Sequence, residues 1–130
     1  MLQHGYAGSY ETLFQRPAPT GVNTVVDNVV KFRSKSSAVW LMTRSEAAAS
    51  MTFRSHRLRA MSVGSIGDRA VGASYNIQAN DAQYTGVYVY FQRGNWDIYV
   101  GEAGLTGTYN PATVIAFARI VDHRIGTQGR

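Results

Sequence analysis

The chain has no cysteine. This absence excludes disulfide bonds, thiolate catalysis and zinc sites built on cysteine. Long apolar segments are also missing, because no hydrophobic run approaches the ~20 residues that a membrane-spanning helix needs. A length of 130 residues with a hydrophobic fraction of 45% suits one folded domain with its own core. We therefore expect a single domain over residues 1–130, with a flexible leader at 1–8 and a flexible tail at 126–130.

Sequence patterns of known catalytic and metal sites are missing as well. The three histidines (His4, His56 and His123) are far apart in the sequence, and no HExxH pattern or carboxylate cluster accompanies them. Asp122 and His123 are adjacent, so on a helix their side chains would point in different directions. We therefore predict no catalytic residue, no metal and no cofactor, which favours a non-catalytic role over an enzymatic one.

Acidic residues are few in the middle of the chain. The formal net charge is +5, and residues 31–69 contain eight basic side chains but only two acidic ones. A localised positive field favours anionic partners, although a solvated surface also explains it. Arg54, Arg57 and Arg59 form the candidate anion-binding segment. They would suit nucleic acid if they shared a sheet face with aromatic side chains.

Two alternating runs joined at Gly94-Asn95 predict a β-hairpin over Val87–Val100, because glycine is typical of the first central position of a two-residue turn. Pairing across this turn places Arg93 opposite Trp96 and Tyr90 opposite Tyr99. One side of the hairpin, the aliphatic face, then consists of Val87, Val89, Phe91, Ile98 and Val100. The other side, the tyrosine face, consists of Tyr88, Tyr90, Gln92, Asp97 and Tyr99.

The tyrosine face allows three interpretations. It could be ordinary core beneath a helix, an interface covered by a second chain, or the lining of a groove for a small ligand or glycan. Each predicted helix has a single apolar stripe, so both helices could pack on the aliphatic face and leave the tyrosines open. We take the tyrosine face as the candidate binding surface, with Arg93 and Trp96 at the hairpin tip. Arg93 over the indole of Trp96 would be a cation–π contact.

The remaining segments predict an α+β domain in the order β-β-α-β-β-β-β-α, with a mostly antiparallel sheet of five or six strands and two helices. Val22–Phe32 fits a strand or a helix, and its valines favour a strand. Ser34 or Ser36 caps the first helix, and Asn110-Pro111 opens a last helix that Gly126 ends. The other strands are expected at Ser9–Gln15, Arg57–Val63 and Arg69–Gln78, with loops at 17–21, 79–84 and 101–108.

Several short motifs follow one another along the chain in a characteristic order. They are an early strand at Ser9–Gln15, a Val-x-Phe-x-Ser entry into a helix at Val30–Ser34, a Gly-Asp-Arg-Ala turn at Gly67–Ala70, and a hairpin motif at Phe91–Asn95. With the final proline-initiated helix, this order resembles the small extracytoplasmic domains of bacterial lipoproteins and sensor proteins of the PsbP/Mog1-like α/β type. The resemblance implies binding of a ligand or protein at the cell envelope, without a shared catalytic site.

We therefore expect a binding or sensor domain of a bacterial cell-envelope protein that recognises a ligand or protein partner through its aromatic sheet face. The alternatives are a self-assembling structural subunit, a nucleic-acid-binding protein, and a small-ligand carrier or enzyme. The first residues lack the charged and apolar regions of a signal peptide, and the chain has no lipobox cysteine. The expected location is extracytoplasmic, with an export segment that this sequence does not contain, and a cytoplasmic location is the alternative.

Overall fold

The computed structural model describes residues 5–18, 21–54, 58–79, 81–106 and 110–128. Within them a six-stranded sheet lies between two helices, in the predicted order β-β-α-β-β-β-β-α. The strands are β1 (Tyr6–Ala18), β2 (Gly21–Phe32), β3 (Arg59–Met61), β4 (Arg69–Ala79), β5 (Ala82–Arg93) and β6 (Trp96–Leu105), and the helices are α1 (Lys35–Arg54) and α2 (Pro111–Gln128). All neighbouring strands pair antiparallel in the order β1-β2-β6-β5-β4-β3, which confirms the α+β class.

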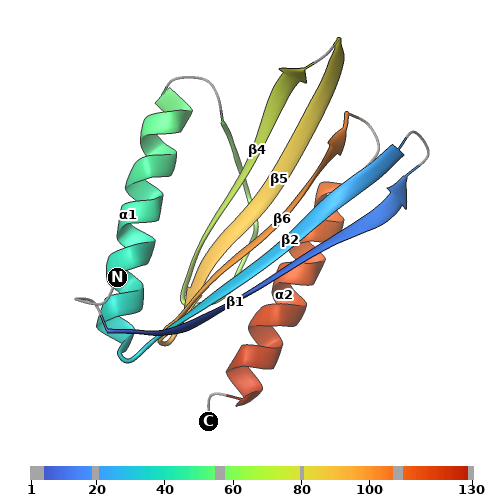
Figure 1. Cartoon of the computed structure of the whole chain (residues 1–130). Coiled ribbons are helices and arrows are strands. Elements are labelled where there is room, and N and C mark those ends of the chain that lie inside the picture. The colour runs from blue at the N-terminus through green and yellow to red at the C-terminus, as the bar shows by residue number, and fades with distance from the viewer. Residues whose placement is uncertain (1–4, 19–20, 55–57, 80, 107–109, 129–130) are drawn as a thin grey trace.

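The two helices cover opposite faces of the sheet (Figure 1). The prediction that both could pack on one face is therefore wrong. α2 packs Val114 and Ala118 against the aliphatic face, whereas α1 stands over the tyrosine face and diverges from the sheet toward its C-terminal end (Figure 1). The physical reason is that apolar side chains occur on both sides of the sheet. Phe32 and Ala73 lie on the tyrosine side and are fully buried, so this side also needs a cover.

The β5–β6 hairpin has the predicted register. Arg93 pairs with Trp96, and Tyr90 pairs with Tyr99. Gly94 has a φ of 56°, the left-handed conformation that the first position of a type II′ turn requires. Because this register holds, the aliphatic face is buried: Val89, Phe91 and Ile98 have no exposed surface and form the core with α2.

The hairpins are longer than predicted. β1 begins at Tyr6, inside the segment expected as a leader, and it pairs with β2 as far as Ala18 opposite Gly21. In the segment 79–84, predicted to be a polar loop, β4 extends to Ala79 and β5 begins at Ala82, which pairs with Ala79. Asp81 has a positive φ of 62°. Polar residues suggested a loop, but strand pairing includes Gln83 and Tyr84 because the sheet hydrogen bonds do not depend on side-chain polarity.

Two glycines in the strands lie beneath tyrosine rings. A Cβ atom built on Gly86 would lie 2.1 Å from Cζ of Tyr75, and one on Gly101 would lie 2.8 Å from the Tyr99 hydroxyl. Each ring therefore occupies the space that a side chain would need. The glycine-rich segment from Gly101 was predicted to be a loop, and this part of the prediction is wrong: residues 101–105 continue β6.

Both helices begin at polar caps. The backbone N–H of Ser37 donates to Oγ of Ser34 at 3.3 Å, which selects Ser34 over Ser36 as the cap of α1. The N–H of Ala112 donates to Oδ1 of Asn110 at 3.0 Å, as predicted for α2. The predicted stop at Gly126 is wrong, because α2 continues to Gln128. In the described part of the chain, neither helix is long and apolar enough to cross a membrane.

Candidate functional site

A groove of about 360 Å³ lies between the C-terminal half of α1 and the tyrosine side of the sheet. We call it the tyrosine groove. The sheet contributes Val71, Tyr88, Tyr90 and Tyr99, α1 contributes Ser45, Glu46 and Ala48, and Leu58 completes the lining. In Figure 1 the N-terminal end of α1 lies nearer to the sheet than its C-terminal end does. The three tyrosines were predicted from the sequence, whereas the wall formed by α1 was not.

The alternation of β5 and β6 positions the tyrosine rings. Tyr90 lies directly opposite Tyr99, and Tyr88 lies opposite Gly101. Because Gly101 has no side chain, the Tyr99 ring can lean across it toward Tyr88. The rings of Tyr88 and Tyr99 stack with centroids 5.4 Å apart and an interplanar angle of 25°. The groove therefore has a flat aromatic floor.

The tyrosine hydroxyls are neutral over the physiological pH range. Burial raises the pKa of Tyr90 and of Tyr99 to about 12. Burial also raises the pKa of Tyr88, with a further increase from nearby Tyr75. The groove therefore presents phenol rings that can stack and donate hydrogen bonds, and none of these tyrosines contributes a charge.

A layer of buried polar groups adjoins the groove at Tyr90. Gln92 and Asp97 lie opposite each other on the tyrosine face, and each is only 1% exposed. Among the described residues, no hydrogen-bond partner exists for either carboxylate oxygen of Asp97 or for Oε1 of Gln92. The Tyr90 hydroxyl, whose hydrogen-bonding neighbour is Ser45 on α1, is buried beside them. We call these atoms the polar layer. Burial raises the pKa of Asp97 to about 7. Buried polar groups in native folds are normally paired, so the unpartnered atoms of this layer need an explanation.

An ion pair links α1 to the sheet beside the groove. The guanidinium of Arg69 on β4 contacts the carboxylate of Glu46, and its Nη1 donates to Oγ1 of Thr43 at 3.3 Å. Arg69 therefore neutralises Glu46, the charged side chain in the groove lining. No group of three or more His, Asp or Glu side chains suited to a metal ion occurs in the ranges that the structure describes.

The structure does not bring Arg93 and Trp96 to the groove. Both lie on the opposite side of the sheet, in the register of the aliphatic face. Arg93 forms a two-point ion pair with Asp122 on α2, with Nε–Oδ1 at 2.6 Å and Nη2–Oδ2 at 2.7 Å. The cation over the Trp96 ring is Lys31, at 4.8 Å from the ring centroid. The expected contact between Arg93 and Trp96 is therefore replaced by two long-range contacts.

Replacing Asp122 with alanine is expected to lower the free energy of unfolding at pH 7 by about 2 kcal/mol, since charged hydrogen bonds are lost and Arg93 is left unpaired. Burial raises the pKa of Asp122, but the hydrogen bonds from Arg93 and from the Gly67 N–H outweigh this effect and keep the pKa below its ordinary value. The stabilisation is therefore present above pH 4 and is lost as the pH falls through the lowered pKa. Urea unfolding at pH 7 and pH 3 measures it, and equal stability of both proteins at pH 7 would contradict the prediction.

The predicted anion-binding arginines do not form a platform with the tyrosines in the described structure. Arg59 is exposed on β3 and pairs with Ser74, which lies opposite Val87 of the aliphatic face. Its side chain is therefore on the side of the sheet opposite the tyrosines. Arg57 lies outside the described residues. Arg54 is the last residue of α1, and the structure does not describe its side chain.

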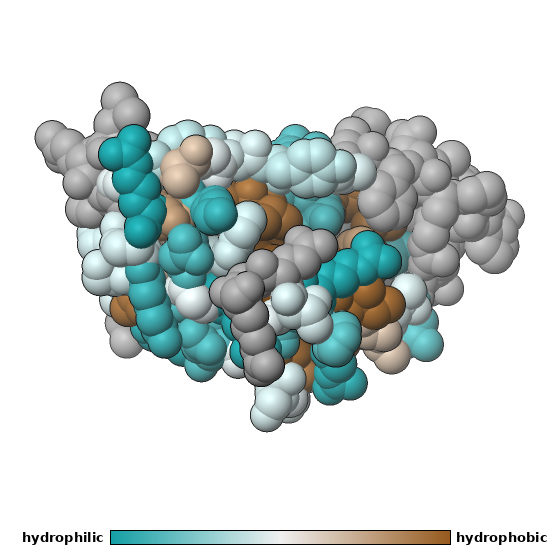
Figure 2. Space-filling view, turned by 90° about the horizontal axis from the view of Figure 1, so that it is seen from below, coloured by the Kyte–Doolittle hydropathy of each residue, from teal (hydrophilic) through white to brown (hydrophobic). Residues whose placement is uncertain are grey.

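Exposed cations gather instead around the β2–α1 connection. Lys31, Arg33 and Lys35 are exposed there, and Lys35 lies 3.2 Å from Asp68. Figure 2 shows this end of the molecule, where hydrophilic residues surround small hydrophobic patches. This part of the basic segment 31–69 therefore forms a solvated surface.

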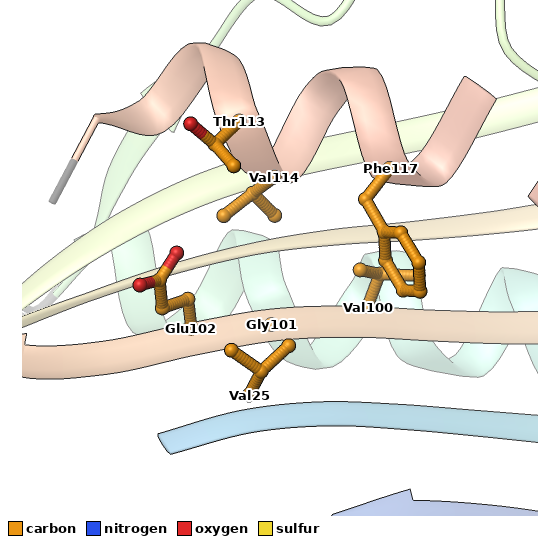
Figure 3. Close-up of a pocket in the computed structure, with 7 residues that line it drawn as sticks. All are labelled: Val25, Val100, Gly101, Glu102, Thr113, Val114 and Phe117. Carbon is orange, nitrogen blue, oxygen red and sulfur yellow. The ribbon is translucent and has the colours of Figure 1, made fainter. Parts of the chain in front are cut away.

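A second cavity of about 170 Å³ lies between α2 and the aliphatic side of the sheet. Figure 3 shows Val114 and Phe117 of α2 above Val100 and Val25, with the Glu102 carboxylate directed toward α2 beside Thr113. We call it the α2 pocket. Its volume is smaller than the range of about 300–1,000 Å³ that is usual for ligand sites.

Comparison with known proteins gives one structural likeness. No protein-family model and no curated protein matches the chain. The fold is similar to the crystal structure of the extracellular domain of PknH from Mycobacterium tuberculosis, with a TM-score of 0.59 and 12% sequence identity. The match covers 93% of this chain and 66% of that domain. At this identity the likeness shows the fold alone: the chain has the fold of a bacterial extracellular domain, and the PsbP/Mog1-like type is not part of this finding.

Proposed function

We propose that this chain is a non-catalytic binding domain of a bacterial cell-envelope protein and that it holds a small ligand in the tyrosine groove. The observation that carries the proposal is the stacked pair of Tyr88 and Tyr99, which lines an open groove between α1 and the sheet. The likeness to a bacterial extracellular domain supports the envelope setting.

The size and lining of the groove support a small ligand. A volume of about 360 Å³ falls in the range of ligand pockets. The floor is aromatic, and Ser45, Glu46 and the tyrosine hydroxyls provide a few polar groups among apolar ones. This combination is typical of sites in which flat or apolar groups stack and a few hydrogen bonds orient them.

The position of α1 favours a small ligand over a second folded chain. The helix stands over the tyrosine face, so a flat protein surface would meet α1 before it reached the rings (Figure 1). A small molecule or an extended segment can enter between the helix and the sheet. For this reason the groove supports a ligand-binding role better than self-assembly through the tyrosine face.

Filling the groove is expected to abolish binding. Replacing Ala48 with tryptophan places a large side chain in the groove from an exposed position on α1, so the fold is kept while the space is lost. A screen of small aromatic fragments by ligand-observed NMR should give hits with the natural sequence that lose at least tenfold in affinity in this variant. Tyr99→Ala should have a similar effect because the stack is removed.

The control for the binding experiment is Tyr10→Ala. Tyr10 is 64% exposed on β1 and lies outside the groove, so its removal should leave fragment binding unchanged. Circular dichroism and thermal unfolding of each variant show whether the fold is intact. Fragments that bind the folded Ala48→Trp variant as tightly as the natural sequence would reject the groove as the binding site.

A further inference from the structure

We propose that the tyrosine groove selects ligands with a cationic nitrogen head on an aromatic or other apolar body, and that Asp97 is the counter-ion of that head. The inference rests on the proposed function and names the chemical class of the ligand. The body would stack on Tyr88 and Tyr99, and the head would lie at the inner end of the groove beside Tyr90.

The composition of the polar layer points to a cationic ligand. Its unpartnered atoms include three acceptors, namely the two carboxylate oxygens of Asp97 and Oε1 of Gln92. The Tyr90 hydroxyl beside them can donate or accept, and its hydrogen-bonding neighbour is Ser45 on α1. These acceptors are buried and do not line the groove, so a cationic ammonium or amidinium head at Tyr90 would complement them through its charge. A carboxylate or phosphate would instead bring a second negative charge close to Asp97.

The local charge also favours a cation, although the protein as a whole carries a net charge of +5. Glu46 is neutralised by Arg69, and Lys and Arg side chains do not contribute to the described lining of the groove. Asp97 is therefore the uncompensated charge near the groove, and its influence reaches the groove floor because it raises the pKa of Tyr90 together with burial. The faces of the tyrosine rings attract cations as well.

Tyr90 connects the groove to the polar layer. Its ring lines the groove, and its hydroxyl belongs to the layer. Gln92 and Asp97 occupy the next paired positions along the same face of β5 and β6. A cationic head beside Tyr90 would therefore lie one same-face residue pair away from Asp97. Charges interact strongly in such a buried region.

The proposal predicts that binding depends on pH. Burial raises the pKa of Asp97 to about 7, so half of the carboxyl groups are protonated near neutral pH. Gln92 on β5 and Val30 on β2 lie opposite Asp97, and neither is titratable. The titratable group of β5 that Asp97 influences is Tyr90, with a pKa of about 12, and Glu46 on α1 is paired with Arg69. Of the two groups here with a raised pKa, Asp97 is the one that changes its charge near pH 7. The affinity for a permanent cation should therefore fall from pH 8 to pH 5.5, by at most about 30-fold, the factor by which the ionised fraction of Asp97 decreases.

Three probes of the same size test the proposal: benzamidine, benzamide and benzoate, which are a cation, a neutral amide and an anion. We expect calorimetric titration at pH 8 to show that benzamidine binds at least tenfold more tightly than benzamide and that benzoate does not bind. Asp97→Asn should reduce benzamidine to the affinity of benzamide and remove the pH dependence. The pH dependence of the natural sequence is a second readout that needs no variant.

The outcomes separate this inference from the proposed function. Equal affinity for benzamidine and benzamide, with both lost in Ala48→Trp, would overturn the cationic selection and leave the groove as a ligand site. Benzamidine binding that Asp97→Asn does not change would overturn the role of Asp97. If no probe binds at 10 mM, the cationic class is rejected, and the fragment screen against Ala48→Trp decides the proposed function on its own.

Discussion

Replacing Asp97 with asparagine is expected to raise the free energy of unfolding at pH 8 by about 3 kcal/mol. Burial raises the pKa of this carboxyl group from 3.8 to about 7, so the folded protein at pH 8 keeps an unpaired charge away from water. Each pKa unit corresponds to about 1.4 kcal/mol, and the buried amide of asparagine cancels part of the gain. Urea unfolding at pH 8 and pH 4 measures the difference.

The direction of the pKa shift determines the pH range in which Asp97→Asn stabilises the protein. Below pH 4, Asp97 is protonated in both the folded and the unfolded protein, so folding buries no charge. This contribution to stability is lost as the pH rises through the folded-state pKa of about 7. The gain from asparagine should therefore be present at pH 8 and vanish at pH 4. Asp81→Asn is the matched control, because Asp81 is exposed and its positive φ suits asparagine. A loss of stability in Asp97→Asn at pH 8 would show that the carboxylate has a partner in solution.

A residue whose removal stabilises a protein is unusual, because most substitutions destabilise. Functional groups are the common exception, since a site arranged for a ligand is incomplete without it. If Asp97→Asn raises stability and lowers the affinity for benzamidine, both results have one cause: the carboxylate lacks a partner in the free protein and finds it in the ligand.

Replacing Phe91 with alanine is expected to lower the free energy of unfolding by about 3–5 kcal/mol. Phe91 has no exposed surface and packs in the core between the sheet and α2, so its removal leaves a cavity that the surrounding side chains cannot fill. Tyr88→Ala should cost about 1–2 kcal/mol, because Tyr88 is partly exposed in the groove. Equilibrium unfolding in urea compares the two variants.

The comparison of these variants tests the assignment of the two sheet faces. Phe91 and Tyr88 belong to the same strand and are both aromatic, so they differ mainly in the face that they occupy. Phe91→Leu is the control for cavity size and should recover most of the loss. If Tyr88→Ala costs as much as Phe91→Ala, the tyrosine face is ordinary core and the groove is rejected.

The sequence by itself determined the local features of this fold. The turn at Gly94-Asn95 settled the register of β5 and β6, and the period of two then divided the hairpin into an aliphatic face and a tyrosine face. The start of α2 at Asn110 could also be predicted, because a helix cap depends on residues that are neighbours in the chain. Such features need no knowledge of distant segments.

Only the tertiary structure decided which face each helix covers. An apolar stripe shows that a helix packs against another apolar surface, but it does not show which one. The residues of α1 and α2 alone therefore could not assign each helix to a face of the sheet. Their placement determines the groove, the pairing of Arg93 with Asp122 on α2, and the burial of Asp97. Gly101 needed the same information, because it is a strand residue through its pairing with Val26 and Tyr88 on neighbouring strands. Long-range packing, rather than local preference, created the candidate site.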